Sequence, residues 1–200
     1  MPRTETAIKE ITDARRREIM KVASRLFLER GFDLVRISDI AEAAGISQGL
    51  TYRYFSDKQE LMLSLVEEGI QEVSLVLGLQ EKATGTAKAR LHKFVELMLD
   101  SIYAHPERQQ IILQGIRFPG KIKERVQALM NEMEATVFAL IVAAQAEGSI
   151  AGDDPRTLSF MLLSALLGIG SGVATFGVAE PSHLPTWSQV VRLCEPGPRT

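Results

Sequence analysis

The sequence predicts an all-α protein. Apolar residues recur at helical spacing along most of the 200 residues, and no alternating strand pattern of useful length occurs. Breaks rich in proline and glycine divide the chain into segments of ordinary helix length. We expect about nine helices, shared between a small N-terminal domain over residues 1–60 and a larger C-terminal domain over residues 61–200.

Composition is that of an ordinary soluble chain, with 46% apolar and 24% charged residues. A formal charge of −2 and an isoelectric point near 6.0 argue against bulk attraction to nucleic acid or anionic membranes. The first 60 residues nevertheless carry a slight excess of positive charge. The single cysteine, Cys194, cannot form an intrachain disulfide, and the first residues lack the apolar core of a signal peptide, so we expect a cytoplasmic protein.

The first helix is amphipathic and has a clear end. Gly31 fits a left-handed cap at its C-terminus, and Phe32 is placed to fold back on the last turn. Charged residues occupy the opposite face of this helix. The apolar positions that define its buried face are Ile19, Val22, Ala23, Leu26 and Phe27.

Two short helices follow, over about residues 38–44 and 48–55. Gly45 permits a tight turn between them, Ser47 is a good N-cap for the second, and Asp57 begins a long fourth helix. Two short helices joined by a glycine-containing turn of three or four residues are the helix-turn-helix pattern, whose second helix enters a DNA major groove.

The second of these helices carries an exposed surface suited to DNA. Thr51 and Phe55 lie one turn apart and can face inward, which leaves the polar and aromatic residues outside. Arg53 can donate two hydrogen bonds to guanine and Gln48 matches adenine, whereas Tyr54 suits a phosphate. The residues that we expect to contact DNA, the last of them through a phosphate, are Ser47, Gln48, Leu50, Tyr52, Arg53, Tyr54 and Lys58.

Residues 14–65 resemble a known family. The segments RREIMKVASRLFLERGF, SDIAEAAGIS and GLTYRYFSDKQEL are similar, in this order, to the DNA-binding domain of TetR-family transcriptional regulators. The chain departs from the family pattern at Arg36, where a threonine often caps the second helix, and at Thr51, where leucine is common. The resemblance implies a homodimeric regulator, most often a repressor, that binds a palindromic double-stranded operator and responds to a small-molecule effector.

The remaining chain resembles the family's variable C-terminal domain in helical layout only. One stretch, residues 158–179, has no charge and is long enough to cross a bilayer, but its glycines and its lack of basic flanks favour a buried helix, so we expect no membrane partner. Ser164, Gly168 and Gly172 form a smooth stripe on it that allows close helix packing, and we expect this stripe in the dimer interface. The helices that we expect here span about 86–104, 106–117, 121–147, 155–178 and 186–194.

A ligand pocket in this domain is expected to be largely apolar. Phe118 precedes the Pro119-Gly120 break, and a break between helices leaves room for a ligand, although for each large apolar residue core packing is the main alternative. The candidates for ligand contact are Met98, Phe118, Met130, Phe138 and Met161.

Two other classes of function remain as alternatives. For an enzyme, the scattered histidines and the absence of His-Glu-x-x-His, Gly-x-Ser-x-Gly and phosphate-loop motifs are unfavourable, and we expect neither catalysis, nor a metal, nor a cofactor. The other is a helical adaptor that binds protein through its tyrosine and arginine surface. Salt dependence separates the adaptor from a DNA-binding protein, because phosphate contacts release counterions.

Overall fold

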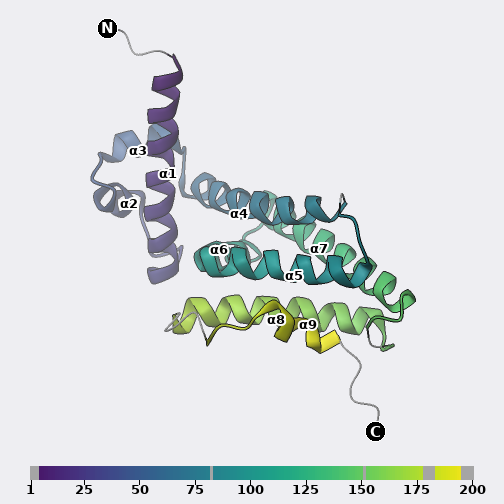
Figure 1. Ribbon diagram of the computed structural model, residues 1–200. Helices are drawn as coiled ribbons and strands as arrows, with labels where there is room; N and C mark the ends of the chain where they lie inside the picture. The colour runs from purple at the N-terminus through teal and green to yellow at the C-terminus, as the bar shows by residue number, and fades with distance from the viewer. Residues whose placement is uncertain (1–4, 82, 151, 178–182, 195–200) are drawn as a thin grey trace. The chain divides into compact units, whose positions relative to one another are not determined.

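The structure is a computed structural model that describes residues 5–81, 83–150, 152–177 and 183–194. Within these ranges it contains nine α-helices and no strand, which confirms the predicted all-α class (Figure 1). A 3-10 turn, η2 (Arg192–Cys194), follows the last helix. The helices are α1 (Glu5–Arg30), α2 (Ile37–Ala43), α3 (Gln48–Tyr54), α4 (Lys58–Glu81), α5 (Ala87–Ala104), α6 (Pro106–Gly115), α7 (Lys121–Ala146), α8 (Pro155–Phe176) and α9 (Trp187–Val191).

The chain divides into two compact units, Met1–Glu67 and Glu68–Thr200. The division falls inside α4, so one continuous helix belongs to both units. The sequence predicts the domain boundary at residue 60, just after the short helices end. Since no glycine or proline interrupts the helical pattern between Lys58 and Glu68, the sequence holds no signal for a division within this helix.

The N-terminal unit is built around the apolar face of α1. Gly31 ends this helix with a φ of 84°, and its N–H donates to the carbonyl of Phe27 at 3.0 Å. The ring of Phe32 then lies 5.1 Å from that of Phe27, so the predicted cap and the folding back of Phe32 are confirmed. The core of the unit is formed by fully or nearly fully buried side chains, among them Ile19, Ala23, Leu26, Phe27, Val35, Ile40, Phe55, Leu61 and Met62.

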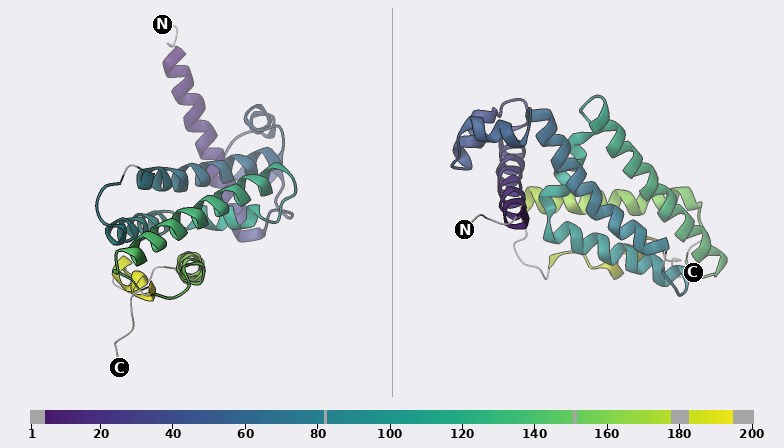
Figure 2. Two further views of the ribbon diagram at one scale, coloured as in Figure 1. Left: turned by 90° about the vertical axis from the view of Figure 1, so that its right-hand side faces the viewer. Right: turned by 90° about the horizontal axis from the view of Figure 1, so that it is seen from above.

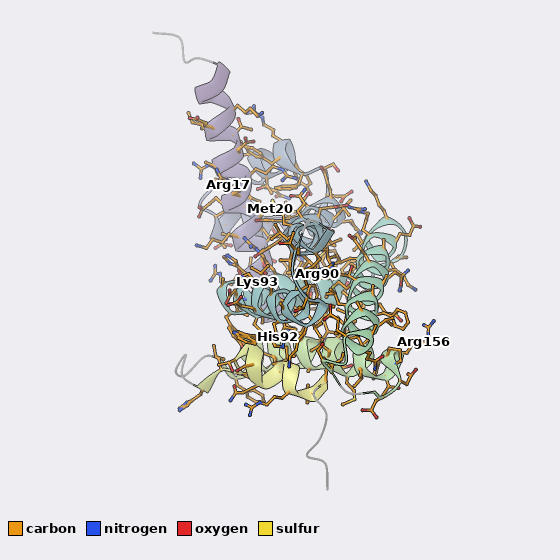
Figure 3. The ribbon with its side chains drawn as sticks, turned by 45° about the vertical axis from the view of Figure 1, so that its right-hand side comes forward. Arg17, Met20, Arg90, His92, Lys93 and Arg156 are labelled. Atoms are coloured by element: carbon orange, nitrogen blue, oxygen red, sulfur yellow. The ribbon has the colours of Figure 1, made fainter. Side chains whose placement is uncertain are left out.

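The C-terminal unit packs its helices in pairs. Helix α5 packs against α7, while α8 packs against both α6 and α7 (Figure 1). The short α9 contacts both α5 and α8, and Figure 2 shows it beside α8 in the view along that helix. Two contacts fix this C-terminal segment on α5: the Tyr103 hydroxyl donates to the Pro185 carbonyl at 2.5 Å, and the ring of His92, labelled in Figure 3, lies 4.9 Å from that of Trp187.

The glycines of α8 differ in their surroundings: Gly170 faces α6, whereas Gly168 and Gly172 have no neighbouring helix beside them within the described residues. A Cβ on Gly170 would lie 1.4 Å from Oε1 of Gln109 on α6, so the end of the Gln109 side chain occupies the space beside this glycine. At Gly168 and Gly172 an added Cβ would meet no heavy atom within 4 Å. The predicted stripe therefore does not form the packing contact between α6 and α8.

The open face of α8 is apolar. Phe160 is 73% exposed, Phe176 is 87% exposed and Met161 is 43% exposed. Helices α7 and α8 are both long and apolar enough to cross a membrane, although length and composition alone are weak evidence for that. Within the described residues, 33% of the apolar window of each helix is buried, and the large apolar side chains that are exposed on these two helices lie mainly on α8.

Candidate nucleic-acid interface and ligand cavity

The turn between α2 and α3 depends on one glycine. Gly45 has a φ of 64°, a conformation that residues with a side chain rarely adopt. Its N–H donates to the Glu42 carbonyl at 3.0 Å, and the Ile46 N–H donates to the Ala41 carbonyl at the same distance. These bonds close the end of α2 and turn the chain sharply into α3.

Helix α3 is fixed at both ends and by one buried face. The Ser47 hydroxyl accepts from the Leu50 N–H at 3.2 Å, as expected for an N-cap. Thr51 is fully buried and Phe55 is 1% exposed, so the inward face is the predicted one. Of the residues expected to contact DNA, Ser47, Gln48, Tyr52 and Arg53 are exposed, whereas Leu50, Tyr54 and Lys58 are half-buried.

Lys58 is held by the protein itself. Its Nζ donates to the carbonyls of Phe32 at 2.6 Å, Val35 at 2.8 Å and Asp33 at 3.4 Å, and it lies 4.2 Å from the centre of the Phe32 ring. An ammonium group has three hydrogens, and three carbonyls are available to accept them. Lys58 therefore ties the start of α4 to the loop between α1 and α2, a role that the sequence interpretation did not include; the phosphate contact stays a prediction.

Arg16 also links α1 to other helices of the N-terminal unit, a role that sequence reasoning missed. One guanidinium nitrogen donates to the Ser64 hydroxyl on α4 at 2.8 Å, and the guanidinium lies 4.8 Å from the centre of the Phe55 ring at the end of α3. The pKa of Glu60 is lowered mainly by its hydrogen bonds with Ser56, and the charge of Arg16 lowers it further. The helical pattern of α1 places Arg16 outside the core but gives no sign of partners about 40 to 50 residues away.

Asp39 supports the start of α2. Its carboxylate accepts from the Arg36 N–H at 2.8 Å, which is one half of a capping box. A guanidinium has no acceptor for the other half, so the departure from threonine at Arg36 removes one cap bond and keeps one.

The C-terminal unit contains a cavity between five helices. Its empty space is about 580 Å³, a volume that includes space open to solvent. Gly69 contributes to the wall at a point where a Cβ would lie 2.9 Å from Ile112 of α6. The apolar residues that line the cavity are Val73 of α4, Met98 and Ile102 of α5, Ile112 and Leu113 of α6, Met130 and Met133 of α7, and Leu163, Leu166 and Leu167 of α8.

The polar lining gathers where α4, α5 and α6 meet. Glu72 accepts from the Ser101 hydroxyl at 2.9 Å and forms an ion pair with Arg108, whose other terminal nitrogen lies 3.6 Å from Oε1 of Glu68. The Gln109 amide donates to the Leu167 carbonyl at 3.3 Å, while its Oε1 is buried and has no hydrogen-bond partner within the described part of the chain. These contacts link α6 to both α4 and α8.

The cavity includes two of the five residues that the sequence nominated for ligand contact. Met98 and Met130 line it, whereas Phe118, Phe138 and Met161 are not part of its lining. The Phe138 ring instead lies 5.2 Å from the Arg156 guanidinium (Figure 3), and Met161 lies on the open face of α8. The sequence shows that these side chains are apolar and recur at helical spacing. It does not show which face of each helix turns toward the cavity.

Two family models match the chain. The one described as "Bacterial regulatory proteins, tetR family" covers residues 19–65, and the one described as "Tetracyclin repressor-like, C-terminal domain" covers residues 84–171. The first contains α2 and α3, and the second contains α5 to α7 and most of α8. The chain belongs to the TetR family of transcriptional regulators.

Relatives in the TetR family match over most of the chain. The HTH-type transcriptional regulator EthR of Mycolicibacterium smegmatis is 26% identical over 149 residues, which are 74% of this chain and 69% of EthR. The HTH-type transcriptional repressor BepR of Brucella suis is 24% identical over 84% of this chain and 82% of its own. Among solved structures, the MbdR regulator from Azoarcus sp. CIB has a TM-score of 0.80 at 23% identity, covering 90% of this chain and 97% of MbdR.

Membership of the TetR family establishes a DNA-binding transcriptional regulator. Proteins of this family are typically repressors whose DNA binding is modulated by ligands, and the relatives that match are regulators, not enzymes. Nothing in these matches supports a helical adaptor. The contacts of individual residues with DNA, ligand or a second subunit stay predictions.

Proposed function

We propose that this chain is a homodimeric repressor that binds a palindromic operator through α3 and releases it when a small, largely apolar molecule occupies the cavity. The N-terminal unit acts as the DNA-binding domain, and the C-terminal unit binds the ligand and the second subunit. The protein acts in the cytoplasm and needs no cofactor and no catalytic step.

The observation that carries the proposal is the continuity of α4. Its first residue, Lys58, holds the loop that precedes α2, and three to four turns later the same helix supplies Gly69, Glu72 and Val73 to the cavity wall. A ligand in the cavity therefore touches the helix that leads directly to the DNA-binding unit. The Pro119-Gly120 break, where the sequence predicts room for a ligand, contributes no residue to the cavity lining.

The second subunit would cover the open face of α8. Phe160 and Phe176 of α8 are both exposed, and the stripe of Ser164, Gly168 and Gly172 leaves room for a close neighbour. Two recognition helices bind one operator only when they lie about 34 to 36 Å apart, or a multiple of that distance. A ligand that shifts α4 in each subunit would change this spacing and so lower the affinity for DNA.

DNA binding is tested first, with sequences selected by the purified full-length protein from a random double-stranded library. We expect an enriched palindrome, and affinity for it that falls steeply as salt rises from 50 to 200 mM, by a factor of about 10³ or more if six phosphates are contacted. Selection without a palindrome, or an affinity that barely changes with salt, would reject the operator assignment.

Ligand control is tested by reciprocity. A small-molecule probe that enters the cavity should bind about 5- to 150-fold more weakly when the selected DNA is present, because the coupling between two sites is equal in both directions. Calorimetric titration of decanamide into the free protein and into the protein–DNA complex measures both affinities. Equal affinity in the two titrations would exclude control of DNA binding by this probe.

A further inference from the structure

The charged groups around Arg108 carry more negative than positive charge. Arg108 and Glu72 line the cavity, and a second carboxylate, Glu68, lies beside Arg108 one turn earlier on α4, with its side chain 44% exposed and outside the lining. His105 also lines the cavity, and its Nδ1 lies 3.5 Å from Oε1 of the Glu107 carboxylate. The cluster therefore has an excess of one negative charge.

The groups that could donate a hydrogen bond to a ligand at the polar end of the cavity already have acceptors in the protein. The Ser101 hydroxyl donates to Glu72, the Gln109 amide donates to the Leu167 carbonyl, and the terminal nitrogens of Arg108 face the two carboxylates. A carboxylate has about four acceptor positions, and Glu72 uses one oxygen for Ser101 and the other for Arg108. Acceptor capacity remains at Glu72, whereas each of these donor groups already has a partner, although the Arg108 guanidinium and the Gln109 amide carry further hydrogens.

A ligand with a free carboxylate would bind unfavourably at the polar end of the cavity. It would have to compete with Glu72 for Arg108 and place a third carboxylate beside two others, with ten apolar side chains around the remainder of the cavity. A hydroxyl, an amide or an ammonium group could donate to Glu72 and leave the ion pair intact. We propose that the cavity selects apolar molecules whose polar end is uncharged or cationic and donates a hydrogen bond, and that it discriminates against free carboxylates.

This inference rests on the proposed function, since it names the chemical class of the effector. The test is a series of three probes with the same ten-carbon chain, used below their micelle-forming concentrations: decanamide, decanoate and decylamine. Decanamide and decanoate have the same shape and differ in charge. Displacement of a neutral environment-sensitive fluorophore from the full-length protein gives the affinity of each probe. We expect decanamide and decylamine to bind at least about tenfold more tightly than decanoate.

Variants assign the discrimination to Glu72. Glu72→Gln keeps the shape of the side chain and an acceptor for Ser101 but removes one negative charge, so it should reduce the difference between decanamide and decanoate by at least half on a logarithmic scale. The matched control is Glu96→Gln, which removes the same charge from an exposed ion pair with Lys93 on α5, outside the cavity lining. Glu96→Gln should leave the difference unchanged. Circular dichroism melts identify any variant that fails to fold, and the comparison of probes on the unmodified chain needs no variant.

The outcomes separate this inference from the function on which it rests. Decanoate that binds as tightly as decanamide, or binding of none of the three probes, overturns the inference while leaving DNA binding to be judged from the selection experiment. A preference that Glu96→Gln changes as much as Glu72→Gln overturns it too, since a general effect of net charge would then explain the data. If the protein prefers decanamide but selects no palindrome, the inferred ligand class stands and the assignment as a repressor is rejected.

Discussion

Replacing Lys58 with methionine distinguishes two roles that this residue could have. If its ammonium mainly holds the loop of residues 32–35, the substitution removes two short charge-assisted hydrogen bonds, at 2.6 and 2.8 Å, and a contact with the Phe32 ring. Each hydrogen bond to a charged group contributes about 1.5 to 3 kcal/mol. Because the side chain is half-buried and water can replace part of what is lost, we expect Lys58→Met to destabilise the N-terminal unit by about 2 to 3 kcal/mol.

The assay combines stability and DNA affinity. Urea unfolding followed by circular dichroism, with hydrogen exchange of peptides from residues 19–65 measured by mass spectrometry, reports the stability of this unit. Fluorescence anisotropy with the selected operator gives the slope of log affinity against log salt. The control is Lys21→Met, which removes the same charge from an exposed position on α1 and should change stability by no more than about 0.5 kcal/mol.

The result that would refute the structural role is specific. If Lys58→Met leaves the stability of the unit within about 0.5 kcal/mol of the original and lowers the salt slope by about one, Lys58 acts on a phosphate and its three carbonyl contacts contribute little. A loss of about 2 to 3 kcal/mol with an unchanged salt slope, measured where the variant is still folded, supports the role as a tie.

Three further substitutions or reactions test other parts of the structure. Arg53→Ala should relax base preference at one position in each half-site at a cost of about 1 to 3 kcal/mol, and equal losses on specific and random DNA would argue against base reading. Gly168→Leu should force α8 away from a second copy and yield monomers in sedimentation experiments, whereas a stable dimer would remove Gly168 from the interface. Burial raises the pKa of the Cys194 thiol to about 11, so we expect a thiol reagent at pH 8 to modify the folded chain at least about tenfold more slowly than the urea-unfolded chain; equal rates would show that this thiol is accessible.

Local signals in the sequence were sufficient for most of the fold. The cap at Gly31 and the turn at Gly45 require positive φ, which only glycine adopts readily, so their positions could be read directly. The N-cap at Ser47 and the inward faces of Thr51 and Phe55 follow from spacing within a few residues. Proline, at Pro106 and Pro155, marks the first residue of two helices in the C-terminal unit.

Contacts between distant residues could not be predicted in this way. The carbonyls that hold Lys58 lie 23 to 26 residues before it, and the hydroxyl that accepts from Arg16 lies 48 residues after it. For the cavity, composition indicated methionine and phenylalanine, but only the packing of five helices determines that Met98 faces inward and Met161 outward. The polar cluster around Arg108 depends on three helices and has no signature within any one of them.

The uninterrupted course of α4 has a consequence for anyone who wishes to build chimeric regulators from this chain. Each residue of an α-helix turns the chain by about 100°, since a full turn takes about 3.6 residues. One residue inserted between Leu63 and Glu68 would rotate everything that follows about the helix axis, whereas an insertion of seven residues, close to two full turns, would nearly restore the phase. Hybrids that exchange the DNA-binding unit should therefore be joined residue for residue within α4, and libraries of junctions that differ by single residues should show responsiveness to ligand that rises and falls with helical period.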